Sequence, residues 1–164
     1  LPEGFITNKL LNNYVISLPT VLIKRQILKK SFFNEKYNII SDRDLLMRIS
    51  LKEKFGCVQL PLAIYRIHQN NFSGKNKLME VKELENWIGN FKKRYLIKFK
   101  LDKSAISRFQ ERLKILKKIN STKGINQKFL ILKELIRNTN LFNFMNFIKV
   151  ILPENVKSKI FFYN

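Results

Sequence analysis

The spacing of apolar residues changes near Gly74, and this change limits what the chain can fold into more than any other feature. Before Gly74, short apolar runs of β-type composition alternate with short helical runs. From Lys77 onward, apolar side chains recur every three or four residues, which is the period of a helix that packs one face against a core. The pattern predicts two parts: residues 1–76, of mixed type, and residues 77–164, which are helical.

The first part contains two segments with the composition of strands. Residues 14–23 are rich in Val, Ile, Leu and Thr, and Pro19 within them requires an edge or an irregularity. Residues 57–67 form a second, mostly apolar run that ends in a polar loop. A short helix is expected over residues 25–30, followed by a polar loop. These segments predict strands mixed with short helices.

A longer helix is predicted over residues 41–55. Ser41 can cap its N-terminus, and Asp44, three residues later, would complete a capping box. In the second part, the periodicity predicts a long amphipathic helix over residues 78–95 and another over 105–116. Two more helices are expected near residues 129–136 and 142–152.

The charge of the chain is strongly positive. Lys and Arg number 32 against 12 Asp and Glu, a formal net charge of +20. Such a balance favours polyanionic partners such as nucleic acid, anionic lipid or phosphate-bearing substrates. The single Cys57 excludes an internal disulfide and a zinc site of several cysteines, which fits a reducing compartment. No apolar run is long enough to predict a membrane-spanning helix.

The carboxylates of the first part that lie where chemistry is plausible are Asp42, Asp44 and, less so, Glu35. Asp42 lies in the first turn of its predicted helix, where free backbone N–H groups favour an ionised carboxylate, so it suits a general base or a simple helix-end charge. His68, the one histidine, ends the second strand-like run and could bind a metal or a phosphate oxygen, or cap the strand. Arg66 lies on the same strand face as His68. Arg48 suits a structural ion pair.

Four motifs follow one another through residues 5–73. They read N-x-x-x-S-x-x-T-V-L-I-K-R, then F-F-N-E, then S-D-R-D-L-L-M-R-I, and finally L-P-L-A-I-Y-R-I-H-Q-N-N-F-S. In this order the sequence resembles the second half of a family 2 glycosyltransferase with the GT-A fold. Ser41 stands where the family often has Glu, and Leu46 where it often has Trp.

The resemblance assigns roles to individual residues. It places the catalytic base on Asp42 and a ligand of the metal-bound sugar nucleotide on His68. Asp44 and Arg48 match the family's D-L-x-x-R helix, and Asn13 and Arg66 match polar positions that line its cleft. The resemblance thus gives four substrate-binding candidates.

The resemblance also implies a fold and a reaction. Residues 1–76 would be the C-terminal, acceptor-side part of an α/β, Rossmann-like GT-A domain, and residues 77–164 an all-α extension. The enzyme would transfer a sugar, with inversion, from a nucleotide-diphosphate sugar to a hydroxyl of a glycan or lipid-linked acceptor during cell-surface polysaccharide or lipooligosaccharide biosynthesis. A divalent metal, Mg²⁺ or Mn²⁺, would assist. The chain lacks the nucleotide-binding half, so it is expected to be an inactive fragment when alone.

Three alternatives stay open. The basic amphipathic helices of residues 77–164 could bind an anionic membrane surface, which would place the protein in the cytoplasm on the inner face of the cytoplasmic membrane. A nucleic-acid-binding helical module would explain the charge, but no recognition-helix motif, zinc spacing or aromatic-basic sheet pattern is present, so no nucleic acid is expected. A non-catalytic remnant of a glycosyltransferase is the third alternative.

Overall fold

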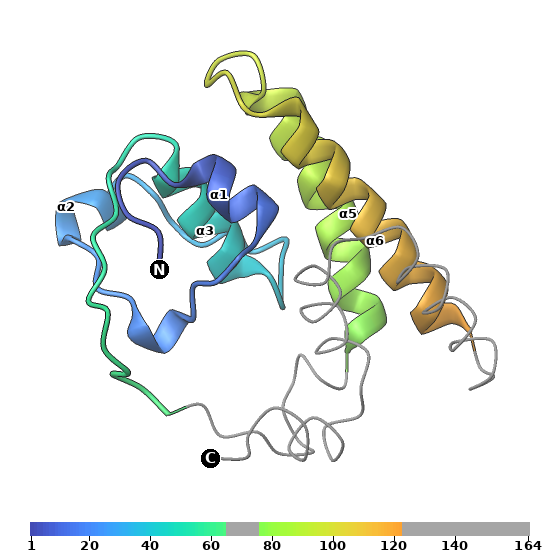
Figure 1. Cartoon of the computed structure of the whole chain (residues 1–164), viewed down its shortest axis with the longest axis horizontal. Helices are drawn as coiled ribbons and strands as arrows, with labels where there is room; N and C mark the ends of the chain where they lie inside the picture. The colour runs from blue at the N-terminus through green and yellow to red at the C-terminus, as the bar shows by residue number, and fades with distance from the viewer. Residues whose placement is uncertain (65–75, 123–164) are drawn as a thin grey trace. The chain divides into compact units, whose positions relative to one another are not determined.

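The computed structural model describes residues 1–64 and 76–122 (Figure 1). The chain divides into two units, Leu1–Tyr65 with Met79–Lys114 and Arg66–Leu78 with Ile115–Asn164. The described elements are α1 (Thr7–Asn12), the 3-10 helix η1 (Leu18–Thr20), α2 (Arg25–Leu28), α3 (Ser41–Ser50), α5 (Lys77–Tyr95) and α6 (Lys103–Ser121). All of them lie in the first unit except the first two residues of α5 and the last turns of α6.

The expected α/β class is wrong for the described residues, which are helical and contain no sheet. Their one β-type pairing is an isolated antiparallel bridge between Gly4 and Phe55. Each residue donates its backbone N–H to the other's carbonyl oxygen, at 2.7 and 2.9 Å. Gly4 has a φ of +83°, a left-handed conformation that glycine adopts without a side-chain clash.

Neither strand-like segment becomes a strand in the described part of the chain. Around Pro19, the N–H groups of Thr20 and Val21 donate to carbonyls three residues earlier. These two donors are therefore not free to pair with a neighbouring β-strand. Residues 58–64 make no backbone-to-backbone hydrogen bond with another described residue. A β-strand is stabilised through a neighbouring strand, and an apolar run without such a neighbour cannot build a sheet.

The helices with a clear apolar period are confirmed. α2, α5 and α6 form where the sequence predicts helices. Helix α3 begins at Ser41 as expected but ends at Ser50, and Phe55, at the expected end, pairs with Gly4 instead. Helix α1 was not expected, since it is short and its N-cap, Ile6, has no capping side chain. The expected helices near residues 129–136 and 142–152 lie outside the described residues.

The expected capping box of α3 is wrong. Ile40 is the N-cap residue, and no side chain of α3 caps the helix. The buried carboxylate of Glu83, on α5, accepts three backbone N–H groups instead, from Asn38 at 2.8 Å, Ile39 at 2.9 Å and Ile40 at 3.2 Å. A carboxylate from a distant helix therefore closes the turn that leads into α3.

The core of the first unit lies where α1, α3, α5 and α6 meet. Its fully buried side chains include Leu10, Leu46, Trp87 and Ile106, none more than 2% exposed. Helices α5 and α6 run antiparallel (Figure 1), and the rings of Trp87 and Phe109 meet edge to face with centroids 5.7 Å apart.

A set of partly buried apolar side chains also packs on α3. It packs against Leu45, Leu46 and Ile49 and consists of Tyr14, Ile16, Val21, Ile23, Ile27, Leu28 and Phe55. The residues on either side of η1 thus bury one set of side chains against α3. Among the described helices, none is long and apolar enough to cross a bilayer.

Candidate functional site

Asp42 lies in the first turn of α3 and is partly exposed. Its Oδ1 accepts the backbone N–H of Arg43 at 2.7 Å. The unpaired N–H groups of a helix N-terminus favour an ionised carboxylate at this position. Asp42 is therefore a charged acceptor at the surface of the first unit, as a general base requires.

Asp44, two residues later, is buried and fully engaged. Its Oδ1 accepts the indole N–H of Trp87 at 3.1 Å, and its Oδ2 accepts Nε–H of Arg48 at 2.9 Å. Arg48 also donates through Nη2 to the carbonyl oxygen of Phe32. Asp44 and Arg48, both expected to bind substrate, thus have structural partners that join α3, α5 and the loop before α3.

The other candidate residues divide into one that is described and two that are not. Asn13 lies at the C-terminus of α1, where its backbone N–H donates to the carbonyl of Lys9 at 2.9 Å. It precedes Tyr14, which contacts the start of α3. Arg66 and His68 lie outside the described residues, so their roles stay predictions.

Arg43, between the two aspartates, is surrounded by three aromatic rings. Its guanidinium carbon lies 4.6 Å from the ring centroid of Tyr14, 5.0 Å from that of Phe109 and 5.9 Å from that of Trp87. These rings come from three separate segments, so a single cation holds the start of α3 against α5 and α6. We call this arrangement the Arg43 cage. Sequence reasoning missed it, because no local spacing shows which cation the aromatic faces of α5 and α6 enclose.

Burial perturbs two groups of the Arg43 cage. Desolvation lowers the pKa of Arg43 to about 10, against the opposing attraction of Tyr14, Glu80 and Asp42, and the side chain stays protonated at neutral pH. Burial, followed by the charge of Asp42, raises the pKa of the Tyr14 phenol. Among the described residues the Tyr14 hydroxyl has no hydrogen-bond partner. A neutral buried phenol therefore lies beside the Asp42 carboxylate.

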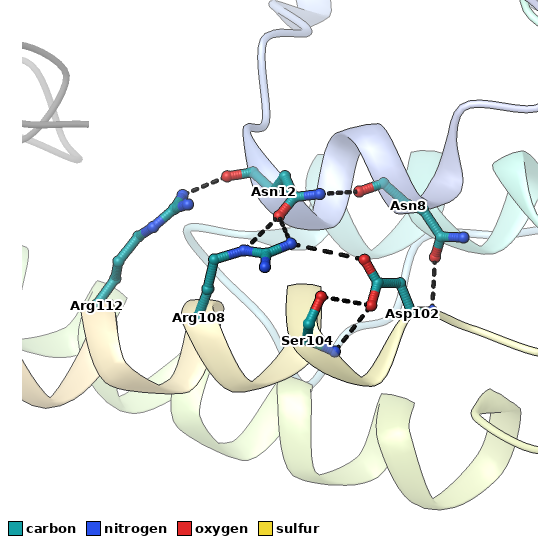
Figure 2. Close-up of polar contacts among 6 residues, drawn as sticks. All are labelled: Asn8, Asn12, Asp102, Ser104, Arg108 and Arg112. Carbon is teal, nitrogen blue, oxygen red and sulfur yellow. Dashed lines mark hydrogen bonds and ion pairs between the residues drawn. The ribbon is translucent and has the colours of Figure 1, made fainter. Parts of the chain in front are cut away.

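A polar network fixes the C-terminus of α1 against α6 (Figure 2). Arg108 donates from Nε and Nη2 to Oδ1 of Asn12, at 3.0 and 2.8 Å, and Arg112 donates to the carbonyl oxygen of Asn12. Cations at the carbonyl end of a helix complement its dipole. Arg108 holds the side chain of Asn12 and Arg112 its carbonyl, so the chain after α1 begins at a fixed position. From there the Tyr14 ring reaches Arg43.

The same network defines the start of α6. Asp102 accepts the backbone N–H of Ser104 at 2.8 Å and its hydroxyl at 2.6 Å, which makes it the cap of the helix. These bonds, the hydroxyl of Ser104 foremost, lower the pKa of Asp102, and Arg108 contributes. Asn8 accepts the N–H of Asp102 at 3.0 Å (Figure 2), so α1 contacts α6 at both of its ends.

The described residues do not form a metal site. Within residues 1–64 and 76–122, no group of three His, Cys, Asp or Glu side chains gathers as ligands. Asp44 has both oxygens in hydrogen bonds, and Asp42 lies beside the cationic Arg43. The Mg²⁺ or Mn²⁺ that the resemblance implies therefore finds no fitting ligand set in this part of the chain.

Comparisons with protein-family models, with curated proteins and with solved structures find no match to this chain. The geometry of α3 and its neighbours is therefore the basis for any functional proposal, together with the order of the motifs in the sequence.

Proposed function

We propose that this chain belongs to an enzyme that transfers a sugar from a nucleotide-diphosphate sugar to a hydroxyl of a glycan or lipid-linked acceptor. The resemblance of the S-D-R-D-L-L-M-R-I and Y-R-I-H-Q-N-N-F-S motifs supports the reaction class. We also propose that the protein lies in the cytoplasm, peripheral on the inner face of the membrane, because lipid-linked glycans are built there.

The observation that carries this proposal is the different surroundings of two aspartates within one turn of α3. Asp44 is buried and engaged by Trp87 and Arg48, so its charge serves the fold. Asp42 is partly exposed in the first turn of the helix, and the Arg43 cage holds the neighbouring residue in place. A fixed, ionised and accessible carboxylate is what abstraction of a hydroxyl proton requires.

The proposed step is a direct displacement with inversion. Asp42 takes the proton from the acceptor hydroxyl while the hydroxyl oxygen forms a bond to the anomeric carbon, and the bond from that carbon to the diphosphate breaks, releasing the nucleoside diphosphate. General-base catalysis of this kind contributes about 10²–10⁴ in rate. Mg²⁺ or Mn²⁺ remains an expectation from the resemblance, and no step of this proposal passes through a metal. His68, Arg66 and Asn13 stay as its substrate-side predictions.

The test is a donor screen on the product of the complete open reading frame. Nucleotide-diphosphate sugars are offered with free and lipid-linked glycan acceptors, and product formation is measured for the natural sequence, for Asp42→Asn and for the exposed control Glu53→Gln. We expect Asp42→Asn to lower turnover about 10²-fold or more while nucleotide binding persists, and Glu53→Gln to behave as the natural sequence. Undiminished turnover in Asp42→Asn would reject the base assignment.

A second measurement concerns the 164-residue chain by itself. We expect no calorimetric signal when UDP-sugars are added to it, because the motifs it carries match the acceptor side. A clear heat of binding would contradict this expectation and place donor contacts within this chain.

A further inference from the structure

We propose that residues 24–33 form a site that binds an anionic lipid surface. The inference deepens the peripheral location in the proposed function by naming the surface responsible, and it does not depend on sugar transfer. It follows from the charge of this segment, from two exposed phenylalanines and from the contacts that hold their loop.

The charge of the segment is positive and concentrated. Lys24, Arg25, Lys29 and Lys30 are all exposed, and no Asp or Glu occurs between Glu3 and Glu35. The apolar residues of α2, Ile27 and Leu28, pack against the buried side chains of α3. Helix α2 therefore buries its apolar side and carries its cations outward, towards any negatively charged surface.

Two phenylalanines follow these cations directly and face solvent. Phe32 is 73% exposed and Phe33 is 50% exposed, whereas Phe91 and Phe109 of the helical core are 3% and 5% exposed. Leu22, just before the first cation, is entirely exposed. Exposed aromatic and aliphatic side chains beside several Lys and Arg residues are the pattern of segments that insert into the interfacial layer of a bilayer.

The loop that carries Phe32 is held in place. Its carbonyl oxygen accepts a hydrogen bond from Arg48, which is itself paired with the buried Asp44. On the N-terminal side, the N–H of Ser31 donates to the carbonyl of Leu28 at 3.1 Å. The exposure of Phe32 thus arises from a fixed backbone, and a loop already fixed in position loses little conformational entropy when it binds.

The same features favour lipid over nucleic acid as the occupant. Charge complementarity alone would suit either. Leu22 is aliphatic and fully exposed, and an aliphatic side chain gains free energy by entering the acyl region but cannot stack on a base. The other exposed apolar run, residues 58–64, contains no cation and so lacks the charge term that an anionic membrane rewards.

The test measures sedimentation of the full chain with vesicles of phosphatidylcholine, either pure or mixed with phosphatidylglycerol, at low and high salt. We expect binding to the anionic vesicles at low salt and little to the neutral ones. The variant Lys29→Gln with Lys30→Gln should weaken binding roughly 20–30-fold, given the contribution of each cation near such a surface. Its matched control, Lys92→Gln with Lys93→Gln, removes the same charge from the exposed face of α5 and should change binding only a few-fold.

A second pair of variants tests the aromatic contribution. Phe32→Ser with Phe33→Ser should weaken binding by roughly tenfold or more, because the inserted apolar surface is lost. Ile97→Ser, at a position 91% exposed in the turn after α5, should leave binding unchanged. Circular dichroism checks that all four variants stay folded, which their exposure predicts.

Three results would overturn the proposal. The first is an equal loss of vesicle binding in the two lysine variants, and the second is unchanged vesicle binding in the phenylalanine variant. The third is that the chain binds a single-stranded oligouridylate more tightly than vesicles, and that the variants within residues 24–33 weaken oligouridylate binding but leave vesicle binding unaffected. The outcome is separable from sugar transfer, because Asp42→Asn should bind vesicles as the natural sequence does. Failure to bind anionic vesicles would also overturn the lipid proposal, whereas the assignment of Asp42 as base is tested separately by the donor screen.

Discussion

The helical core and the run of residues 58–64 both contain large apolar side chains, but these have opposite surroundings. In the core, Leu46 is fully buried, and the nearby Asp44 carboxylate accepts the indole N–H of Trp87. In the run, Leu62 is 68% exposed and Ile64 is 99% exposed, and no backbone-to-backbone hydrogen bond joins the segment to another described residue. This difference shows that apolar residues are buried only when their spacing also suits the backbone. A helix pairs its own backbone N–H and C=O groups and needs only packing against a neighbour. An extended segment needs a neighbouring strand as well, to pair those groups.

The strongest way to test this comparison is to truncate one leucine in each region. Leu46→Ala should lower the free energy of unfolding by about 2–5 kcal/mol, because it leaves a cavity in a packed core. Leu62→Ala should change it by less than about 0.5 kcal/mol, because the side chain contacts mainly solvent. Urea unfolding followed by circular dichroism measures both. A large loss in Leu62→Ala would mean that the run is covered in solution.

A second test concerns the polar order of the core. Glu83→Gln replaces one of the oxygens that accept the N–H groups of Asn38, Ile39 and Ile40 with a donor. We expect the unfolding free energy to fall by about 2–3 kcal/mol, since a buried donor is then left without an acceptor. The control is Glu53→Gln, at an exposed position, which should be neutral within about 0.5 kcal/mol. Equal effects in the two variants would show that Glu83 does not hold the entry to α3.

The smallest expected effect concerns pH and the start of α6. Because the pKa of Asp102 is lowered in the folded chain, mainly by the Ser104 hydroxyl, its carboxylate adds stability above the ordinary pKa of 3.8. That contribution is lost as the pH falls through the lowered folded value. Asp102→Asn keeps the capping oxygen but not the charge, so its stability should fall less steeply below about pH 4 than that of the natural sequence. Parallel slopes in acid unfolding would argue against the cap.

The sequence predicted those parts of the fold that depend on local pattern. Helices α5 and α6 follow from apolar spacing, and the break before α6 coincides with the Asp102 cap. Helix α1 escaped prediction because its stability comes from a distant contact, the hydrogen bond from Thr7 to the carbonyl of Ser50 at 2.7 Å. The capping box failed for the same reason, since Glu83 reaches the turn before α3 from another helix.

The candidate site was predictable in part. The position of Asp42 at the first turn of a helix could be foreseen, because the helix start is encoded locally. The engagement of Asp44 by Trp87 could not, as it joins residues far apart in the chain. The Arg43 cage likewise depends on rings from three segments, and its enclosure of a cation is a property of the packed structure.

The two aspartates of α3 have different surroundings, and we propose that Asp44 stabilises the fold whereas Asp42 acts as the base. The most direct measurement is the urea unfolding free energy of Asp44→Asn and Asp42→Asn, side by side in the 164-residue chain. Asp44→Asn should lose about 2–3 kcal/mol, because its charge-assisted bonds to Arg48 and Trp87 weaken. Asp42→Asn should lose less than about 1 kcal/mol, the usual value of a charge at a helix N-terminus. Equal losses, or a larger loss at Asp42, would contradict the account.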